Sequence, residues 1–150
     1  MQKITPFLWI NADLKEVIGY YTSIFKNSSI ISTHEMGDGS FMTASIELEG
    51  QRLMLLNGGQ FEPNASFSLF VRCETQQEVD YYWDTLTADG GAESMCGWLR
   101  DKYGLSWQII PNVLMDLMSA GGEGSQRVMQ AMMQMSKIEI SKLEEAYNAQ

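Results

Sequence analysis

The sequence predicts an α+β protein built from two tandem βαβββ-type modules, with the second module ending in C-terminal helices in place of its last strand. Three observations predict this fold: an internal repeat, strand-like segments around each copy of it, and helical spacing near the C-terminus. At 150 residues the chain has the size of one domain. We expect a single domain, with module one at about 1–60, module two at about 65–111 and a helical extension at 112–150.

The repeat relates residues 13–21 to residues 75–83, at a spacing of 62 residues. Each copy opens with a capping box, in which the first side chain and a Glu three positions later satisfy free backbone donors at a helix start. Apolar residues then recur on one helical face of each copy. They are Leu14, Val17, Tyr21, Ile24 and Phe25 in the first copy, and Val79, Tyr82, Trp83 and Leu86 in the second. Both copies are expected to be helices that pack on the core.

Strand-like segments precede and follow these helices. Residues 4–11 and 66–74 lead into the two copies, and alternation of apolar and polar residues marks 40–50 as a strand. The other expected strands are 28–37 and 51–59 in the first module, and 92–99 and 105–111 in the second. Asp101 belongs to the turn between the last two. After residue 111 the spacing of Leu, Val and Met is helical, which favours a packing surface against the protein itself or a partner subunit.

Composition narrows the classes of function. Net charge is −9 and the pI is about 4.5, which disfavours nucleic acid and anionic membrane surfaces as partners and favours cationic ligands. Apolar runs are all shorter than the roughly 18 residues that span a bilayer, and the first residues lack a signal-peptide core. We therefore expect a soluble, cytoplasmic protein in which Cys73 and Cys96 are buried and reduced.

Several segments together resemble a known family. They are "FLWIN", "YYTSIF", "SFMTASIELEGQ", "LNGG", "CGWLRDKYGLSWQIIP" and "RVMQAMMQM". Two βαβββ modules in tandem resemble the vicinal oxygen chelate superfamily of glyoxalases, extradiol dioxygenases, fosfomycin resistance enzymes and bleomycin resistance proteins. These segments are similar to its PhnB-like branch, often labelled 3-demethylubiquinone-9 3-methyltransferase. The resemblance implies a glyoxalase-like fold, a U-shaped cavity and a homodimer.

In metal-dependent members of the superfamily, four strands supply the metal ligands. The resemblance places these positions at Pro6, Ser68, Gln108 and around Met54. None of the four offers the imidazole, carboxylate or thiolate that divalent first-row metals prefer. We therefore expect neither a metal nor another cofactor.

A different metal or acid–base site remains open as an alternative, and it would use His34, Glu47 or Glu93. The methyltransferase label has less support. No glycine-rich turn follows the first strand of a doubly wound sheet, where S-adenosylmethionine normally binds.

The remaining candidates suit a ligand pocket, which needs apolar walls and a few placed hydrogen-bonding groups. Ser68 and Gln108 would form hydrogen bonds, and Phe70 and Trp98 would form an aromatic wall. Trp9 is either a wall of the pocket or packing beneath a helix.

Alternation along the last strand places Trp107 on the face opposite Gln108. The leading hypothesis is a metal-independent protein that binds a small, cationic molecule. The alternatives are a glyoxalase or dioxygenase-class enzyme and a protein that assembles through its Met-rich tail.

Overall fold

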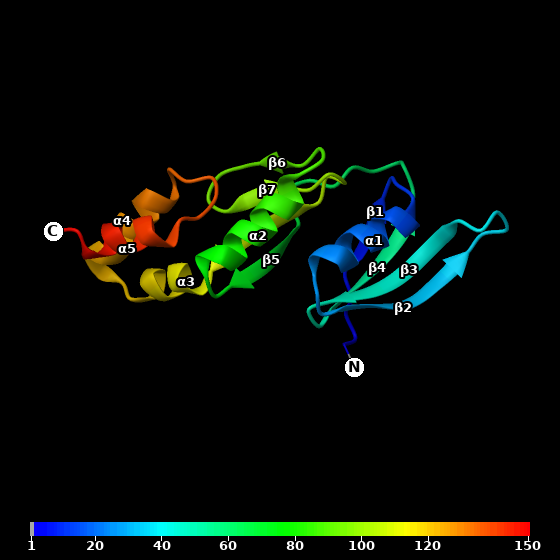
Figure 1. The fold of residues 1–150 in the computed structure, drawn as a ribbon, viewed down its shortest axis with the longest axis horizontal. Coiled ribbons are helices and arrows are strands. Elements are labelled where there is room, and N and C mark those ends of the chain that lie inside the picture. Colours follow the sequence, from blue (N-terminus) through cyan, green and yellow to red (C-terminus); the bar gives the residue numbers. More distant parts are fainter. Residues whose placement is uncertain (1) are drawn as a thin grey trace. The chain divides into compact units, whose positions relative to one another are not determined.

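The computed structural model describes residues 2–150 and contains two compact units, Met1–Pro63 and Asn64–Gln150. The first unit holds one helix and four strands (Figure 1). These are β1 (Phe7–Ile10), α1 (Leu14–Ile24), β2 (Ser28–Glu35), β3 (Phe41–Leu48) and β4 (Gln51–Asn57). The strands form one sheet in the order β1-β4-β3-β2, in which only the β1–β4 pair is parallel. The first unit is therefore a βαβββ module, as the sequence predicts.

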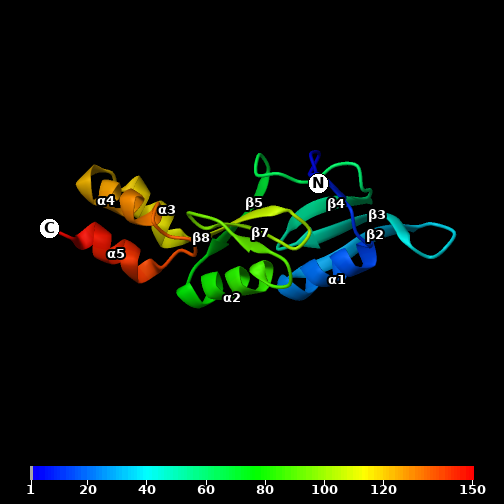
Figure 2. The same cartoon turned by 90° about the horizontal axis from the view of Figure 1, so that it is seen from above.

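Helix α1 covers one face of this sheet (Figure 2). The side chain of Asp13 accepts a hydrogen bond from the backbone N–H of Lys15 and caps the helix start. All five residues of the predicted apolar face are buried, and Leu14, Val17 and Tyr21 are fully so. They pack on Ala44, Ile46, Leu48, Leu53 and Leu55 of the sheet. We call the side of each sheet that faces away from its helix the open face of that sheet.

The second unit repeats the arrangement. Its elements are β5 (Ser68–Cys73), α2 (Gln76–Thr87), β6 (Ala92–Glu93), β7 (Trp98–Arg100) and β8 (Ser106–Pro111). They form a sheet in the order β5-β8-β7-β6, again with one parallel pair, β5 and β8. At the start of α2, Thr75 Oγ1 accepts from the N–H of Glu78, whose carboxylate accepts from the N–H of Glu74. The tandem α+β fold is confirmed.

One detail of the expected fold is wrong: the C-terminal helices do not replace the last strand of the second module. Residues 92–99 were expected to form a single strand, but they form β6, a tight turn and β7. Cys96 and Gly97 adopt positive φ angles of 61° and 82° in that turn. A Cβ at Gly97 would lie 3.0 Å from the backbone carbonyl oxygen of Ile109, and L side chains rarely adopt its positive φ, so this position favours glycine. The second sheet is therefore complete before the helices begin.

Three helices follow β8: α3 (Asn112–Ser119), α4 (Gly122–Met132) and α5 (Ile140–Asn148). They enclose an apolar cluster of Ile110, Leu114, Val128, Met135, Ile138 and Leu143. We call these helices and their connections the C-terminal extension (Figure 2).

The side chain of Gln76 at the start of α2 holds the extension. Its Nε2 donates to the carbonyl of Ile138 at 2.9 Å, and its Oε1 accepts from the N–H of Ile140 at 2.7 Å.

Both cysteines are free thiols, as expected. Cys73 is buried on the side of its sheet that α2 covers, and burial, with a smaller contribution from the charge of Glu78, raises the pKa of its thiol to about 12. Cys96 is only half-buried, so the expectation of burial is met by one thiol of the two. Among residues 2–150, no helix combines the length and apolarity needed to cross a membrane.

Candidate functional site

The open face of the second sheet carries most of the candidate residues. Along β5, Ser68, Phe70 and Arg72 alternate with residues that point toward α2. Phe70 is 44% exposed, whereas Cys73, which has the opposite phase, is fully buried. This alternation identifies the side of β5 that faces away from the helix.

The register of the sheet places these side chains in rows. One row runs from Ser68 through Ser106 to Arg100, and the next runs from Phe70 through Gln108 to Trp98. Residues directly opposite one another in neighbouring strands point to the same face of a sheet. We call these six residues, together with Arg72, the second-unit face.

Two of the candidate residues are hydrogen-bonded to each other at the centre of this face. The Nε2 atom of Gln108 donates to the Oγ atom of Ser68 at 3.0 Å. The serine hydroxyl still has a proton to donate, and the glutamine carbonyl can still accept. The structure therefore brings together a neutral pair with one donor and one acceptor to spare.

Phe70 and Trp98 flank this polar pair. Gln108 lies between them in the same row, with Phe70 on β5 and Trp98 on β7. Trp98 is half-buried and Phe70 is exposed. Polar groups set between aromatic side chains are typical of small-molecule sites.

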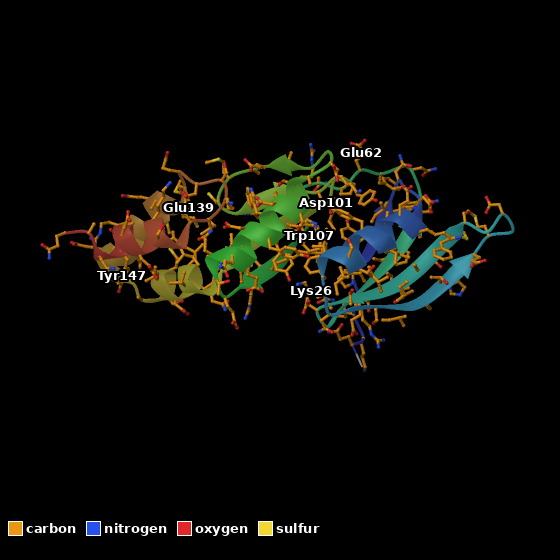
Figure 3. All side chains as sticks on the ribbon, in the orientation of Figure 1. Lys26, Glu62, Asp101, Trp107, Glu139 and Tyr147 are labelled. Atoms are coloured by element: carbon orange, nitrogen blue, oxygen red, sulfur yellow. The ribbon has the colours of Figure 1, made fainter. Side chains whose placement is uncertain are left out.

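Trp107 lies on the opposite face from Gln108, as the alternation predicts. Its Nε1 atom donates to Oδ2 of Asp101 at 2.8 Å, and both residues are buried (Figure 3). Oδ1 of Asp101 also accepts from the backbone N–H groups of Tyr103 and Leu105. Asp101 is thus the turn residue expected from the sequence, and its carboxylate organises the β7–β8 connection.

Trp9 lies on the open face of the first sheet, so it does not pack beneath α1. It has the phase of the exposed Phe7, whereas Ile10 is buried against the helix. Its ring centroid is 4.9 Å from that of Phe61. A Cβ at Gly58 would lie only 1.8 Å from its Nε1 atom, so the indole rests directly on that glycine.

The sequence alignment of the two modules needs one correction. The helix spacing of 62 matches Pro6 with Ser68, but Pro6 has the phase of the residues of β1 that face α1. Thr5 is the counterpart of Ser68 on the open face. The turn between β1 and the cap Asp13 is one residue longer than the turn between β5 and the cap Thr75. A one-residue difference moves a strand side chain to the other face.

The alternative metal residues are not brought together. His34 and Glu47 lie on neighbouring strands of the first unit, where Nδ1 of His34 is 3.2 Å from Oγ1 of Thr43 and Glu47 pairs with Arg52. Glu93 is in the second unit, on the side of α2, and accepts a hydrogen bond of 2.8 Å from Nε1 of Trp83. Among residues 2–150, no three His, Cys, Asp or Glu side chains are grouped to hold a metal.

A separate cleft of about 480 Å³ lies where α2 meets the C-terminal extension. Its lining residues are Gln76, Asp80, Lys137, Glu139, Ile140, Ser141 and Glu144. Lys137 pairs with Asp80 at 3.0 Å, and Gln76 donates to Asp80 and to the extension. These interactions attach the extension to α2. The polar residues that line the cleft therefore have a structural role that needs no ligand.

The fold defines a glyoxalase-like protein of the vicinal oxygen chelate superfamily. The family model for 3-demethylubiquinone-9 3-methyltransferase matches residues 2–110. A PhnB protein from Bacillus cereus, described under the same name, is 33% identical with a TM-score of 0.67, over 73% of this chain and 99% of that chain. The chain therefore belongs to this PhnB-like family.

More distant structures share the fold. Protein PA1353 from Pseudomonas aeruginosa is 17% identical with a TM-score of 0.60, over 74% of this chain and 98% of that chain. The fosfomycin resistance protein FosX from Listeria monocytogenes is 15% identical with a TM-score of 0.55, over 71% and 87%. No curated protein matches the chain.

The family's name implies methyl transfer from S-adenosylmethionine, which usually binds at a glycine-rich turn between a strand and a helix. Here the turn from β1 to α1 is residues 11–13 and the turn from β5 to α2 is residues 74–75. Neither turn contains glycine, and both sheets are mixed. The described residues do not fit that cofactor.

Proposed function

We propose that this protein binds a small molecule on the second-unit face without a metal ion. The observation that carries the proposal is the hydrogen bond from Gln108 to Ser68. The family resemblance implies a metal-binding carboxylate at the position of Gln108. An amide and a hydroxyl in its place supply hydrogen bonds but no negative charge, which divalent metals need.

The chemistry of the face supports binding better than catalysis. Its seven side chains include no carboxylate, imidazole, thiol or amine that could act as a general acid or base. One FosX structure is described as a complex with Mn(II) and a dihydroxypropylphosphonic acid. At 17% identity that likeness shows the fold alone, so the metal of FosX is not transferred to this chain.

Three further features bear on the same proposal. The family resemblance implies a homodimer, in which one module can complete the cavity of another. The acidic composition, with a net charge of −9, attracts cationic or amine-bearing molecules toward the chain at long range, whereas the groups beside the site decide which ligand binds. Trp9 is a further candidate for an aromatic contact with a ligand, because its indole is fixed on the open face of its own sheet.

The first test is metal content. Protein purified without a metal-affinity tag is incubated with Zn, Ni, Mn and Fe(II), desalted and analysed for metal. We expect far less than one equivalent per chain, because the face offers only neutral oxygen and nitrogen donors. Retention of one equivalent would contradict metal independence.

The second test is ligand binding. A small-molecule panel is screened by thermal shift, since a ligand at a hundred times its dissociation constant stabilises the folded state by about 2.7 kcal/mol. Gln108→Leu should weaken any hit about tenfold or more, because it leaves the Ser68 hydroxyl without its partner. Gln77→Leu, on the exposed side of α2, is the matched control. A hit that both variants bind equally well would place its site elsewhere.

A further inference from the structure

The charge of the second-unit face is opposite to that of the whole chain. The chain has a net charge of −9, yet this face carries Arg72 and Arg100 and no acidic side chain. Both arginines are exposed. Charges beyond about 8–10 Å are strongly screened at physiological salt, so a bound ligand responds mainly to the groups beside it.

The arginines are placed on either side of the polar pair. Arg100 shares a row with Ser106 and Ser68, and neighbouring strands are about 4.8 Å apart. Arg72 lies two residues beyond Phe70 on β5, about 6.7 Å along the strand. Each guanidinium stands on a long side chain that can reach over the Gln108–Ser68 pair.

The other two arginines of the chain have structural partners. Arg52 pairs with Glu47, and Arg127 donates to the backbone carbonyls of Ala146 and Tyr147. Within residues 2–150, the side chains of Arg72 and Arg100 form no hydrogen bond or ion pair with other side chains or with backbone carbonyls. The five N–H donors of each exposed guanidinium therefore remain available on the side of the sheet where the ligand is proposed to bind.

We propose that the ligand is a small molecule with an anionic oxygen group, such as a carboxylate or phosphonate, on an aromatic or apolar body. Arg100 contacts the anionic group, with Arg72 as the second contact. Phe70 and Trp98 pack on the body, and Gln108 and Ser68 bond a neutral polar atom. This inference rests on the proposed function, and it opposes the cationic preference that net charge alone favours.

Three probes of the same shape test the inference: benzoate, benzamide and benzylamine, which at neutral pH are anionic, neutral and cationic. Binding is followed by tryptophan fluorescence and by ¹⁵N NMR. We expect benzoate to bind about tenfold tighter than benzylamine, because charge-assisted hydrogen bonds to a carboxylate are the strong ones. Raising the salt concentration should weaken the binding of benzoate and leave the binding of benzamide unchanged.

Substitutions locate the effect. Arg100→Gln should weaken the binding of benzoate about tenfold and change the affinity for benzamide by less than about twofold. Arg100→Lys, which keeps the charge, should restore most of the affinity and shows that the fold is intact. Lys142→Gln removes one positive charge from an exposed ion pair at α5. It should leave the affinity for both probes unchanged.

The outcomes separate the two proposals. If benzamide binds in a Gln108-dependent way and benzoate binds no tighter, the face binds ligands but the anionic class is wrong. A preference for benzylamine also overturns the anionic class. If none of the probes binds at millimolar concentration, both proposals lose their support.

Discussion

The two sheets have the same topology but different open faces. In each, the first and last strands of the βαβββ module form a parallel pair at one edge of the sheet. The helix side of each sheet is alike. Val17 and its counterpart Val79 are both fully buried, as are Tyr21 and its counterpart Trp83. The repeat has kept the residues that attach helix to sheet.

The open faces have diverged. The first sheet has two long strands of 8 residues, β2 and β3, and an open face with Phe7, Trp9 and Met54. The corresponding strands of the second sheet, β6 and β7, have only 2 and 3 residues. Its face holds the neutral pair and the two arginines, and its unit carries the C-terminal extension. The difference shows that helix packing fixes the fold while the open faces remain free to specialise.

The largest expected effect concerns the extension, which only the second unit has. Ile138 is fully buried in the C-terminal cluster and lies against the β6–β7 turn. Ile138→Ala should destabilise the protein by about 2–5 kcal/mol, because a cavity remains after the lost burial. Ile4→Ala, at a site 89% exposed in the first unit, should change stability by less than about 0.5 kcal/mol. Equal urea midpoints for the two variants would mean that the extension adds little to the second unit.

A smaller effect is expected on the open face of the first sheet. Gly58→Ala places a methyl group on the indole of Trp9 and must displace it. We expect a loss of about 1–3 kcal/mol and a shift in tryptophan emission. Gly37→Ala is the matched control, since a Cβ there meets nothing within 4 Å. Unchanged emission in Gly58→Ala would show that Trp9 is not held against this glycine.

The helix layer and the order of elements could be predicted from the sequence because they rest on local signals. Capping residues and helical spacing are visible in the repeat at 62 residues. The phase of β1 could not be predicted from the sequence. One extra residue before α1 reverses which side chains of β1 point away from the helix. Arg72 could have been found, since alternation along "SLFVRC" places it with Ser68 and Phe70.

Other parts of the site had no local signal. The row that unites Phe70, Gln108 and Trp98 depends on pairing between strands distant in sequence. The same is true of Gln76, which bonds Ile138 and Ile140 more than 60 residues away. Long-range register is set by packing and turn geometry together, so a single sequence does not reveal it.

The smallest effect concerns the ion pair that helps hold the extension on α2. Hydrogen bonds from Gln76 and Lys137 lower the pKa of Asp80, and the hydrogen bond with Asp80 raises the pKa of Lys137. The contribution of Asp80 to stability is therefore present above about pH 4 and lost as pH falls through its lowered pKa. The contribution of Lys137 is present below about pH 10.4 and lost as pH rises through its raised pKa.

Asp80→Asn should reduce the pH dependence of the free energy of unfolding at both the acidic and the alkaline end. The measurement is urea unfolding between about pH 3 and pH 11. The cost near neutral pH should be at most about 1 kcal/mol, because the two side chains are 33% and 43% exposed. Asp84→Asn is the control, since Asp84 is 70% exposed and lies 3.9 Å from Lys137. If Asp84→Asn flattens the profile as much as Asp80→Asn, the pH dependence comes from general charge on α2. In that case the ion pair would not be what distinguishes the second unit from the first.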